Sequence, residues 1–333
     1  MKVGKKLAFP ILFFVALVFI SPLFGRDWVK DPPWIEIPFA PRVAAIGDVH
    51  GAFSQMAASL EALGFAKRLS PDSFKLTWTG GKNVLVFVGD LNDRGENTKE
   101  VYDGVMDLEI QAKEAGGQVV SVLGNHEVLL LNGTVEEWAK TLKPPKKQHY
   151  QNTIDSFTKA GLDFHQAISK NGLYGSWIRR RPLFAIINGF LFVHGGLPDP
   201  ARSRSDVAAD FRDAVESESW SKGIMMDEKG PLWIREWWNN PSLIQQNFKT
   251  FGIRGVVFGH TVGALGHPGW IDKIEGNVVS IDIGMTPAYG KSNGGGILIN
   301  ADPNGKMVFR AKYPDRPEAI LLQIPPTSSV KKT

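Results

Sequence analysis

The chain of 333 residues contains no cysteine. This absence excludes disulfide bridges, thiol catalysis, and zinc or iron–sulfur sites that are held by cysteine. Any bound metal ion must therefore be held by histidine, aspartate, asparagine or water. Excess charge is also lacking, because the formal net charge is only +4. The lysines form no obvious basic groove, so we expect no nucleic-acid partner.

Charged residues are missing from residues 7–24, which follow Lys2, Lys5 and Lys6. As a helix this stretch would be about 27 Å long, slightly less than the roughly 30 Å of a bilayer core. Basic residues before such a stretch are typical of a secretory signal peptide or of an uncleaved membrane anchor. We expect residues 1–25 to be one of the two. The rest of the protein would then be exported across a membrane, to a periplasmic, extracytoplasmic or organelle intermembrane space, and would touch the membrane only through this segment.

The remaining sequence divides into three regions by composition, and the second contains an insertion. Residues 26–41 are rich in proline and tryptophan and are expected to form a linker. Residues 42–314 begin with strand and helix patterns in β-α-β-α-β order, which is typical of a sheet covered by helices. Within them, residues 128–175 are more polar and are expected to form a cap-like insertion of helices and loops. Residues 315–333 are expected to be a polar tail.

Several strands can be placed more closely. Residues 76–88 predict a hairpin around Gly80-Gly81, and residues 183–193 predict another around Asn188-Gly189. Four later apolar stretches indicate the strands of a second sheet, namely residues 254–258, 278–283, 296–299 and 307–311. The predicted fold is therefore an α/β sandwich of two sheets flanked by helices.

One stretch organises the chain, Val84 to Gly95, which reads VLVFVGDLNDRG. An apolar strand runs into a glycine turn, and polar residues follow at once. The same arrangement recurs four times, and open α/β sheets bind their ligands at such strand ends. The four other turns are Gly47-Asp48-Val49-His50-Gly51, Gly124-Asn125-His126-Glu127, His194-Gly195-Gly196 and Gly259-His260-Thr261.

The side chains at these strand ends have the chemistry of a metal site. Oxygen and imidazole donors of this mixture suit Mn, Fe or Zn. Six donors are too few for two closed sites but enough for two ions that share a ligand, and Asp90 on the central strand is the natural bridge. Two ions about 3.5–4 Å apart can bind a phosphate and ionise a bridging water. The six candidate ligands are Asp48, His50, Asp90, Asn125, His194 and His260.

Three neighbouring residues suit a phosphate substrate. The planar guanidinium of Arg94 matches the geometry of phosphate oxygens. His126 follows a candidate ligand and is placed to protonate a leaving group, with Asp93 holding its ring.

Together, the five ordered motifs resemble those of the calcineurin-like metallophosphoesterases. Within that family the chain is most similar to the PPP-type phosphoprotein phosphatases, in particular to the Shewanella-like branch. The cues for this branch include Phe192–Leu197, Gly230–Arg235, Phe258–Thr261 and Ile281–Met285, with Ala288-Tyr289-Gly290 following. One position departs from the family pattern, because Asn92 stands where valine is usual. We expect this side chain to point into the packed interior and away from the metal ions, so that it tunes the site without abolishing it.

The resemblance implies a role for each candidate residue. It implies that Asp48, His50 and Asp90 hold one metal ion, and that Asp90, Asn125, His194 and His260 hold the other. It further implies that His126 and Asp93 form the general-acid pair and that Arg94 binds phosphate. Arg235 is our choice for a second phosphate-binding arginine.

The expected function is metal-dependent hydrolysis of a phosphate monoester by a metal-bridging hydroxide. The expected substrate is a phosphoprotein or phosphopeptide, modified on Ser/Thr or on Tyr. One alternative is a hydrolase of dinucleoside polyphosphates or other nucleotides. The other is a membrane-tethered binding module that has lost turnover.

Overall fold

The computed structural model describes residues 26–290 and 292–326. The predicted signal peptide or anchor, residues 1–25, lies outside the described residues. Among the helices of the two described ranges, none has both the length and the apolar character that crossing a membrane requires.

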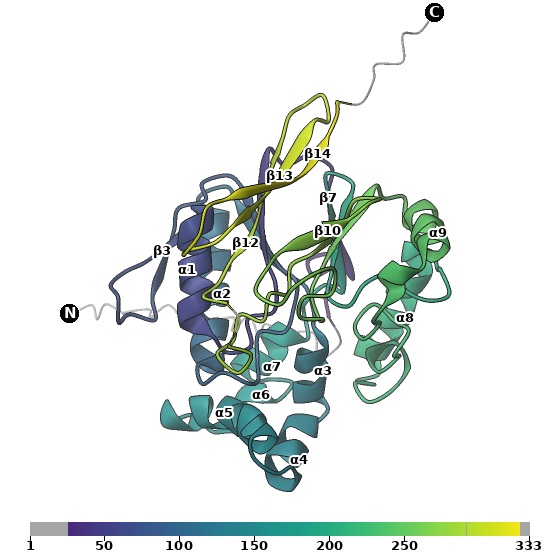
Figure 1. Cartoon of the computed structure of the whole chain (residues 1–333). Coiled ribbons are helices and arrows are strands. Elements are labelled where there is room, and N and C mark those ends of the chain that lie inside the picture. The colour runs from purple at the N-terminus through teal and green to yellow at the C-terminus, as the bar shows by residue number, and fades with distance from the viewer. Residues whose placement is uncertain (1–25, 291, 327–333) are drawn as a thin grey trace, which may run out of the picture.

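Two six-stranded sheets form the centre of the molecule (Figure 1). The order in the first sheet is β14 (Ala319–Ile324), β13 (Met307–Lys312), β12 (Gly296–Ala301), β2 (Arg42–Ile46), β5 (Val84–Phe87) and β6 (Gln118–Ser121). The order in the second sheet is β1 (Trp34–Ile37), β7 (Phe184–Ile187), β8 (Phe190–Val193), β9 (Gly255–Phe258), β11 (Val278–Ser280) and β10 (Asp272–Ile274). The predicted two-sheet α/β fold is confirmed.

The strands that carry the site motifs run parallel to one another within each sheet. In the first sheet β2, β5 and β6 are parallel, and in the second sheet β8 and β9 are parallel. All four residues of β5 are buried, as are those of β8 and β9. Continuous apolar sequence is typical of parallel strands that are covered on both faces. The two sheets share one hydrophobic core, in which the rings of Phe190 and Phe309 lie 4.8 Å apart between centroids.

Helices flank both sheets (Figure 1). α1 (Phe53–Leu63) and α2 (Thr98–Glu114) lie beside the first sheet, whereas α8 (Arg204–Glu216) and α9 (Pro241–Phe251) lie on the far side of the second. α1 ends at Gly64, whose φ of 73° is in the left-handed region that glycine adopts readily. Short 3₁₀ turns occur at Gly223–Met225 and Trp237–Asn239.

The helices that follow β6 gather at one end of the molecule, at the bottom of Figure 1. The range 128–175, for which the sequence predicted helices and loops, falls within them. They are α3 (Asn125–Leu131), α4 (Thr134–Thr141), α5 (Lys146–Lys159), α6 (Phe164–Ile168) and α7 (Leu173–Ile178).

Both ends of the described chain are more ordered than the sequence predicted. The expected linker of residues 26–41 contains β1, which pairs in parallel with β7. The expected polar tail after residue 315 contains β14, which pairs antiparallel with β13. Each strand forms by pairing with another strand, β1 with the distant β7 and β14 with β13 across an intervening loop. Local composition therefore did not reveal either strand.

Two strand pairings also differ from the prediction. β4 (Leu76–Trp78) pairs with β3 (Ala66–Arg68) in a separate two-stranded sheet, so residues 76–88 do not form a hairpin. The later strands divide between the sheets, with β9 and β11 in the second and β12 and β13 in the first. The hairpin of β7 and β8 is confirmed, and its turn residues Asn188 and Gly189 have φ of 53° and 76°.

Candidate metal and phosphate site

The five motif strands converge on one site between the two sheets. β2, β5 and β6 bring their carboxyl ends from the first sheet, and β8 and β9 bring theirs from the second. Hydrogen bonds join the two sets of turns. His194 Nδ1 lies 2.9 Å from the Val88 carbonyl oxygen, and the His260 N–H donates to both carboxylate oxygens of Asp48 at 3.0 Å. The sequence motifs therefore meet in space as predicted.

The turns hold their residues in an unusual backbone conformation. In the described ranges nine non-glycine residues have positive φ, and five of these are candidate site residues. Strain of this kind is concentrated at functional sites and persists only where the surrounding structure enforces it. The five residues and their φ values are His50 (47°), Asp90 (53°), Asp93 (69°), Arg94 (69°) and His260 (66°).

Glycine is required where the turns pack against each other. A Cβ atom on Gly124 would lie 2.3 Å from both the backbone nitrogen and Oδ1 of Asp90. A Cβ atom on Gly89 would lie 2.6 Å from Gly124 Cα. Both distances are far below van der Waals contact, so these two glycines let Asp90 approach the turn after β6.

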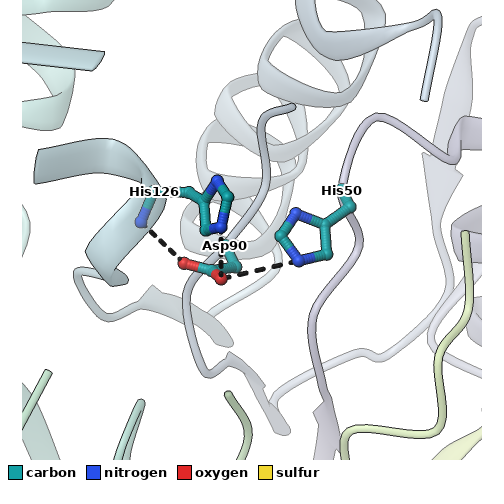
Figure 2. A group of neighbouring side chains, drawn as sticks. All are labelled: His50, Asp90 and His126. Carbon is teal, nitrogen blue, oxygen red and sulfur yellow. Dashed lines mark hydrogen bonds and ion pairs between the residues drawn. The ribbon is translucent and has the colours of Figure 1, made fainter. Parts of the chain in front are cut away.

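Asp90 is the centre of the site (Figure 2). Its Oδ2 lies 3.5 Å from His50 Nε2 and 3.9 Å from His126 Nε2, and its Oδ1 lies 3.2 Å from His194 Nε2. Figure 2 shows the two rings approaching this carboxylate from different elements, His50 from a loop and His126 from the start of helix α3. The two oxygens therefore face two different sets of imidazoles, which is the arrangement that a bridging ligand requires.

Two groups of side chains are compact enough to hold a metal ion. One contains His50, Asp90 and His126, and the other contains Asp90, His194 and His260. Asn125 adjoins the second group, because its Oδ1 lies 2.7 Å from His194 Nε2. All four residues assigned to the second ion are thus brought together.

The first group differs from the set assigned to the first ion. It contains His126 in place of Asp48, whose carboxylate accepts the backbone N–H of His260. Sequence spacing did not show this contact, because Asp48 follows β2 of the first sheet and His260 follows β9 of the second.

The imidazoles are oriented as metal ligands usually are. His50 Nδ1 lies 2.8 Å from the Asn92 carbonyl oxygen, and His260 Nε2 lies 3.1 Å from that of Trp233. Together with His194, whose Nδ1 contacts the Val88 carbonyl oxygen, three rings each have one nitrogen within hydrogen-bond distance of a backbone carbonyl oxygen. This arrangement reserves the other ring nitrogen for a metal ion, as is typical of metal-binding histidines. This donor set fits divalent transition metals.

The buried carboxylates give the site an excess of negative charge. Burial raises the pKa of Asp48 well above its usual range, and the nearby Asp282 raises it further. Burial and the charge of Asp90 raise the pKa of Glu127 to about 7, and burial raises that of Asp282 to about 6. Burial disfavours the charge of His194, but Asp90, together with Asp48 and Glu127, outweighs this effect and raises the pKa of His194 to about 9. A bound cation would offset this crowding of negative charge.

The three residues proposed to act on phosphate lie together. His126 Nδ1 is 2.6 Å from Asp93 Oδ2, and its Nε2 is 3.2 Å from Arg94 Nη2. Asp93 is fully buried. Within the described ranges the Nε atom of Arg94 has no hydrogen-bond partner. Tyr289 lies against the same guanidinium, with 5.1 Å between Arg94 Cζ and the ring centroid.

Arg235 lies at the other end of the site. Its Nη1 donates to the His260 carbonyl oxygen at 3.0 Å and to Thr261 Oγ1 at 2.7 Å. The side chain is exposed and adjoins the turn after β9.

Glu127 is a structural residue that sequence reasoning did not single out. Its carboxylate accepts the N–H groups of Gly124, Asp90 and Leu91 at 2.8, 3.0 and 2.7 Å. An acidic residue in the first turn of a helix is a capping signal, so its position after Asn125 could have revealed this role.

The side chain of Asn92, which stands where the family usually has valine, forms two hydrogen bonds. Its Nδ2 donates to the His126 carbonyl oxygen and its Oδ1 accepts from Tyr102, both at 3.1 Å. The expectation that this side chain points away from the candidate metal ligands agrees with these contacts. The side chain thus helps to hold the backbone of His126.

Helix α5 contributes contacts that no motif indicated. Thr153 Oγ1 lies 2.8 Å from Asp93 Oδ1, and the ring of Tyr150 is nearly parallel to that of His126 at 6.4 Å between centroids. Only the fold brings these residues to the site, because they lie between the third and fourth motifs in a helix that has no motif of its own.

Comparison with known proteins agrees with this geometry. The sequence pattern of the family described as calcineurin-like phosphoesterase matches residues 41–264. An uncharacterised protein of Schizosaccharomyces pombe is 26% identical over 315 residues, which cover 86% of this chain and 87% of that protein. Shewanella-like protein phosphatase 2 of Arabidopsis thaliana is 25% identical and is matched over 74% of this chain and 71% of its own length.

A solved structure shows the same fold. The crystal structure of a cold-active protein-tyrosine phosphatase from a psychrophilic Shewanella species superposes with a TM-score of 0.67 at 21% identity. The match covers 87% of this chain and 82% of that one. The predicted resemblance is confirmed, and the chain belongs to the calcineurin-like phosphoesterases.

Proposed function

We propose that this phosphoesterase is a metal-dependent phosphatase that hydrolyses phosphate monoesters on proteins or peptides. The observation that carries the proposal is the buried His126–Asp93 pair, which lies beside both Arg94 and the Asp90 carboxylate. A proton donor, a phosphate-binding cation and a candidate metal site thus adjoin one another. The protein phosphatases among the relatives support the choice of substrate class.

Two divalent ions would be held by the residues at the strand ends. We propose Asp48, His50 and Asp90 for one ion, and Asp90, Asn125, His194 and His260 for the other. When bound, such ions supply a nucleophilic water and neutralise charge on the phosphoryl group. The raised pKa values of Asp48 and Glu127 support a cation at this place.

The protein's own residues would bind the phosphate and deliver a proton. The Nε and Nη groups of Arg94 are donors for the phosphate oxygens, and Arg235 supplies a second positive charge beside the turn after β9. Asp93 keeps a proton on His126 Nδ1, so that Nε2 is the atom that delivers a proton to the leaving oxygen. Preorganised donors of this kind stabilise charge that develops in the transition state.

The proposal is tested by comparing substrates of two classes. Phosphate release from phosphoserine, phosphothreonine and phosphotyrosine peptides is measured beside cleavage of a dinucleoside polyphosphate, with the manganese-loaded protein. We expect fast peptide dephosphorylation, and the preferred peptide reveals the residue specificity. Nucleotide cleavage with inert peptides would instead assign the protein to nucleotide hydrolysis. Two bound ions without turnover of either class would favour a binding module.

A further inference from the structure

One face of helix α5 is directed at the Asp93–Arg94 turn. His149, Asn152 and Thr153 are spaced three and four residues apart, so they lie on the same side of the helix. Each of them makes a hydrogen bond to Asp93 or Arg94. The helix belongs to the insertion that follows β6, and the turn belongs to the loop after β5.

Thr153 holds both the backbone and the side chain of Asp93. Its hydroxyl donates to Asp93 Oδ1 at 2.8 Å and accepts the Asp93 N–H at 2.9 Å. The other carboxylate oxygen, Oδ2, is the partner of His126 Nδ1. Thr153 and Asp93 are both fully buried, so water does not replace this contact. The hydroxyl therefore fixes which oxygen faces His126 and the plane in which it lies.

The backbone of Arg94 is held by the same helix. The Arg94 N–H donates to the His149 carbonyl oxygen at 2.6 Å, and Asn152 Nδ2 donates to the Arg94 carbonyl oxygen at 2.8 Å. Asp93 and Arg94 both have φ of 69°, a conformation that non-glycine residues adopt only when their surroundings enforce it. Three backbone polar groups of this strained turn are bonded to α5.

We propose that α5 is a positioning element for the reaction, with two separable parts. Thr153 orients the general-acid pair through Asp93, and Asn152 orients the phosphate-binding arginine through its backbone. This inference rests on the proposed phosphatase function. It makes the helical insertion a part of the catalytic apparatus, in addition to any role in covering the site.

The Thr153 part is tested with substrates that differ in their need for an acid. A good leaving group such as p-nitrophenolate departs without a proton, whereas the serine alkoxide of a phosphopeptide requires one. In Thr153→Val we expect kcat for the phosphoserine peptide to fall about tenfold, which is part of the usual contribution of a general acid. We expect kcat for p-nitrophenyl phosphate to change by less than about twofold. Thr153→Ser keeps the hydroxyl and should restore the peptide rate.

The control for the first part is Ser156→Ala on the same helix. Ser156 Oγ donates to the Thr153 carbonyl oxygen but does not contact Asp93, so its loss perturbs α5 without altering the pair. Equal losses on both substrates in Thr153→Val, or none on either, would overturn the role of Thr153. If Thr153→Val does not fold, Thr153→Ala replaces it, with thermal unfolding and metal content as checks.

The Asn152 part predicts a different kinetic change. In Asn152→Ala we expect KM and the inhibition constant of inorganic phosphate to rise about fivefold, the effect of one lost hydrogen bond. The ratio of the two substrate rates should stay unchanged. The control is Gln148→Ala, which removes the Gln148–Asn152 bond but keeps the contact of Asn152 to Arg94. Unchanged phosphate affinity in Asn152→Ala would overturn this part.

The wild type and His126→Asn separate this inference from the proposed function. If the metal-loaded wild type hydrolyses no phosphate monoester, the proposed function fails. If His126→Asn loses peptide turnover while Thr153→Val matches the wild type, only the role of Thr153 fails.

Discussion

Asp93 Oδ2 lies 2.6 Å from Nδ1 of His126, in a contact that is almost completely closed to solvent. An ionised carboxylate only accepts hydrogen bonds, so this contact places a proton on Nδ1 of the ring. The remaining ring nitrogen, Nε2, then faces Asp90 Oδ2 at 3.9 Å. In the proposed mechanism, Asp93 would therefore set Nε2 as the nitrogen of His126 that delivers a proton.

Replacement of this histidine tests its assignment as the proton donor. We expect His126→Asn to lower kcat for phosphoserine peptides by about 10²–10³-fold, within the usual range for a general acid. The bound metal content, measured by elemental analysis, should not change. Because His126 forms a compact group with His50 and Asp90, loss of one ion in this variant would show that it is a metal ligand instead.

The two arginines should differ in importance. Arg94 adjoins the general acid, whereas Arg235 is exposed at the other end of the site. We expect Arg94→Ala to lower kcat/KM by about 10²-fold, because it removes a charge-assisted phosphate contact, and Arg235→Ala to lower it by about tenfold or less. Steady-state kinetics on one phosphopeptide measure both. A larger loss in Arg235→Ala would reverse the assignment.

Asn92 offers a test of stability at the position where the family usually has valine. In Asn92→Val the Tyr102 hydroxyl and the His126 carbonyl each lose the hydrogen bond to Asn92, so the free energy of unfolding should fall by about 2–3 kcal/mol. Tyr102→Phe alone should cost about 1 kcal/mol. Because both changes remove the same contact, the double variant should lose less than the sum, as a double-mutant cycle in urea would measure. Strict additivity would contradict the account.

The binding of metal should depend on pH through His194. Burial lowers the pKa of this ring, but Asp90, together with Asp48 and Glu127, outweighs burial and raises it from 6.5 to about 9. The proton on His194 therefore stabilises the metal-free fold below about pH 6.5, and this stability is lost as the pH rises to about 9. A metal ion must displace the same proton. Its affinity should therefore increase about tenfold per pH unit over this range. Calorimetric titration with Mn at several pH values checks this, and an affinity independent of pH would contradict it.

The sequence was sufficient for the residues whose positions are set by local structure. A buried strand followed by a glycine turn places the next polar residue at the end of the sheet, so Asp90, Asn125 and His194 could be found one motif at a time. Their meeting in one site followed from the rule that ligands bind at the carboxyl ends of parallel strands.

What could not be predicted depends on contacts between distant segments. Thr153 and Asn152 lie in a polar helix without a motif, and only its packing against the turn after β5 makes them important. The strands β1 and β14 are marginal by composition and form because β7 and β13 offer free edges. The contact of Asp48 with His260 required the relative placement of the two sheets.

We propose that Asp90 would be a ligand of both metal ions in a site that hydrolyses phosphate monoesters. The most direct test is a titration of metal-free protein with Mn, in which bound ions and phosphate release from a phosphopeptide are measured together. We predict that two ions bind, that activity appears as the second ion binds, and that Asp90→Asn loses both tight binding and turnover. Undiminished turnover in Asp90→Asn, or in the metal-free protein with a chelator present, would contradict the account.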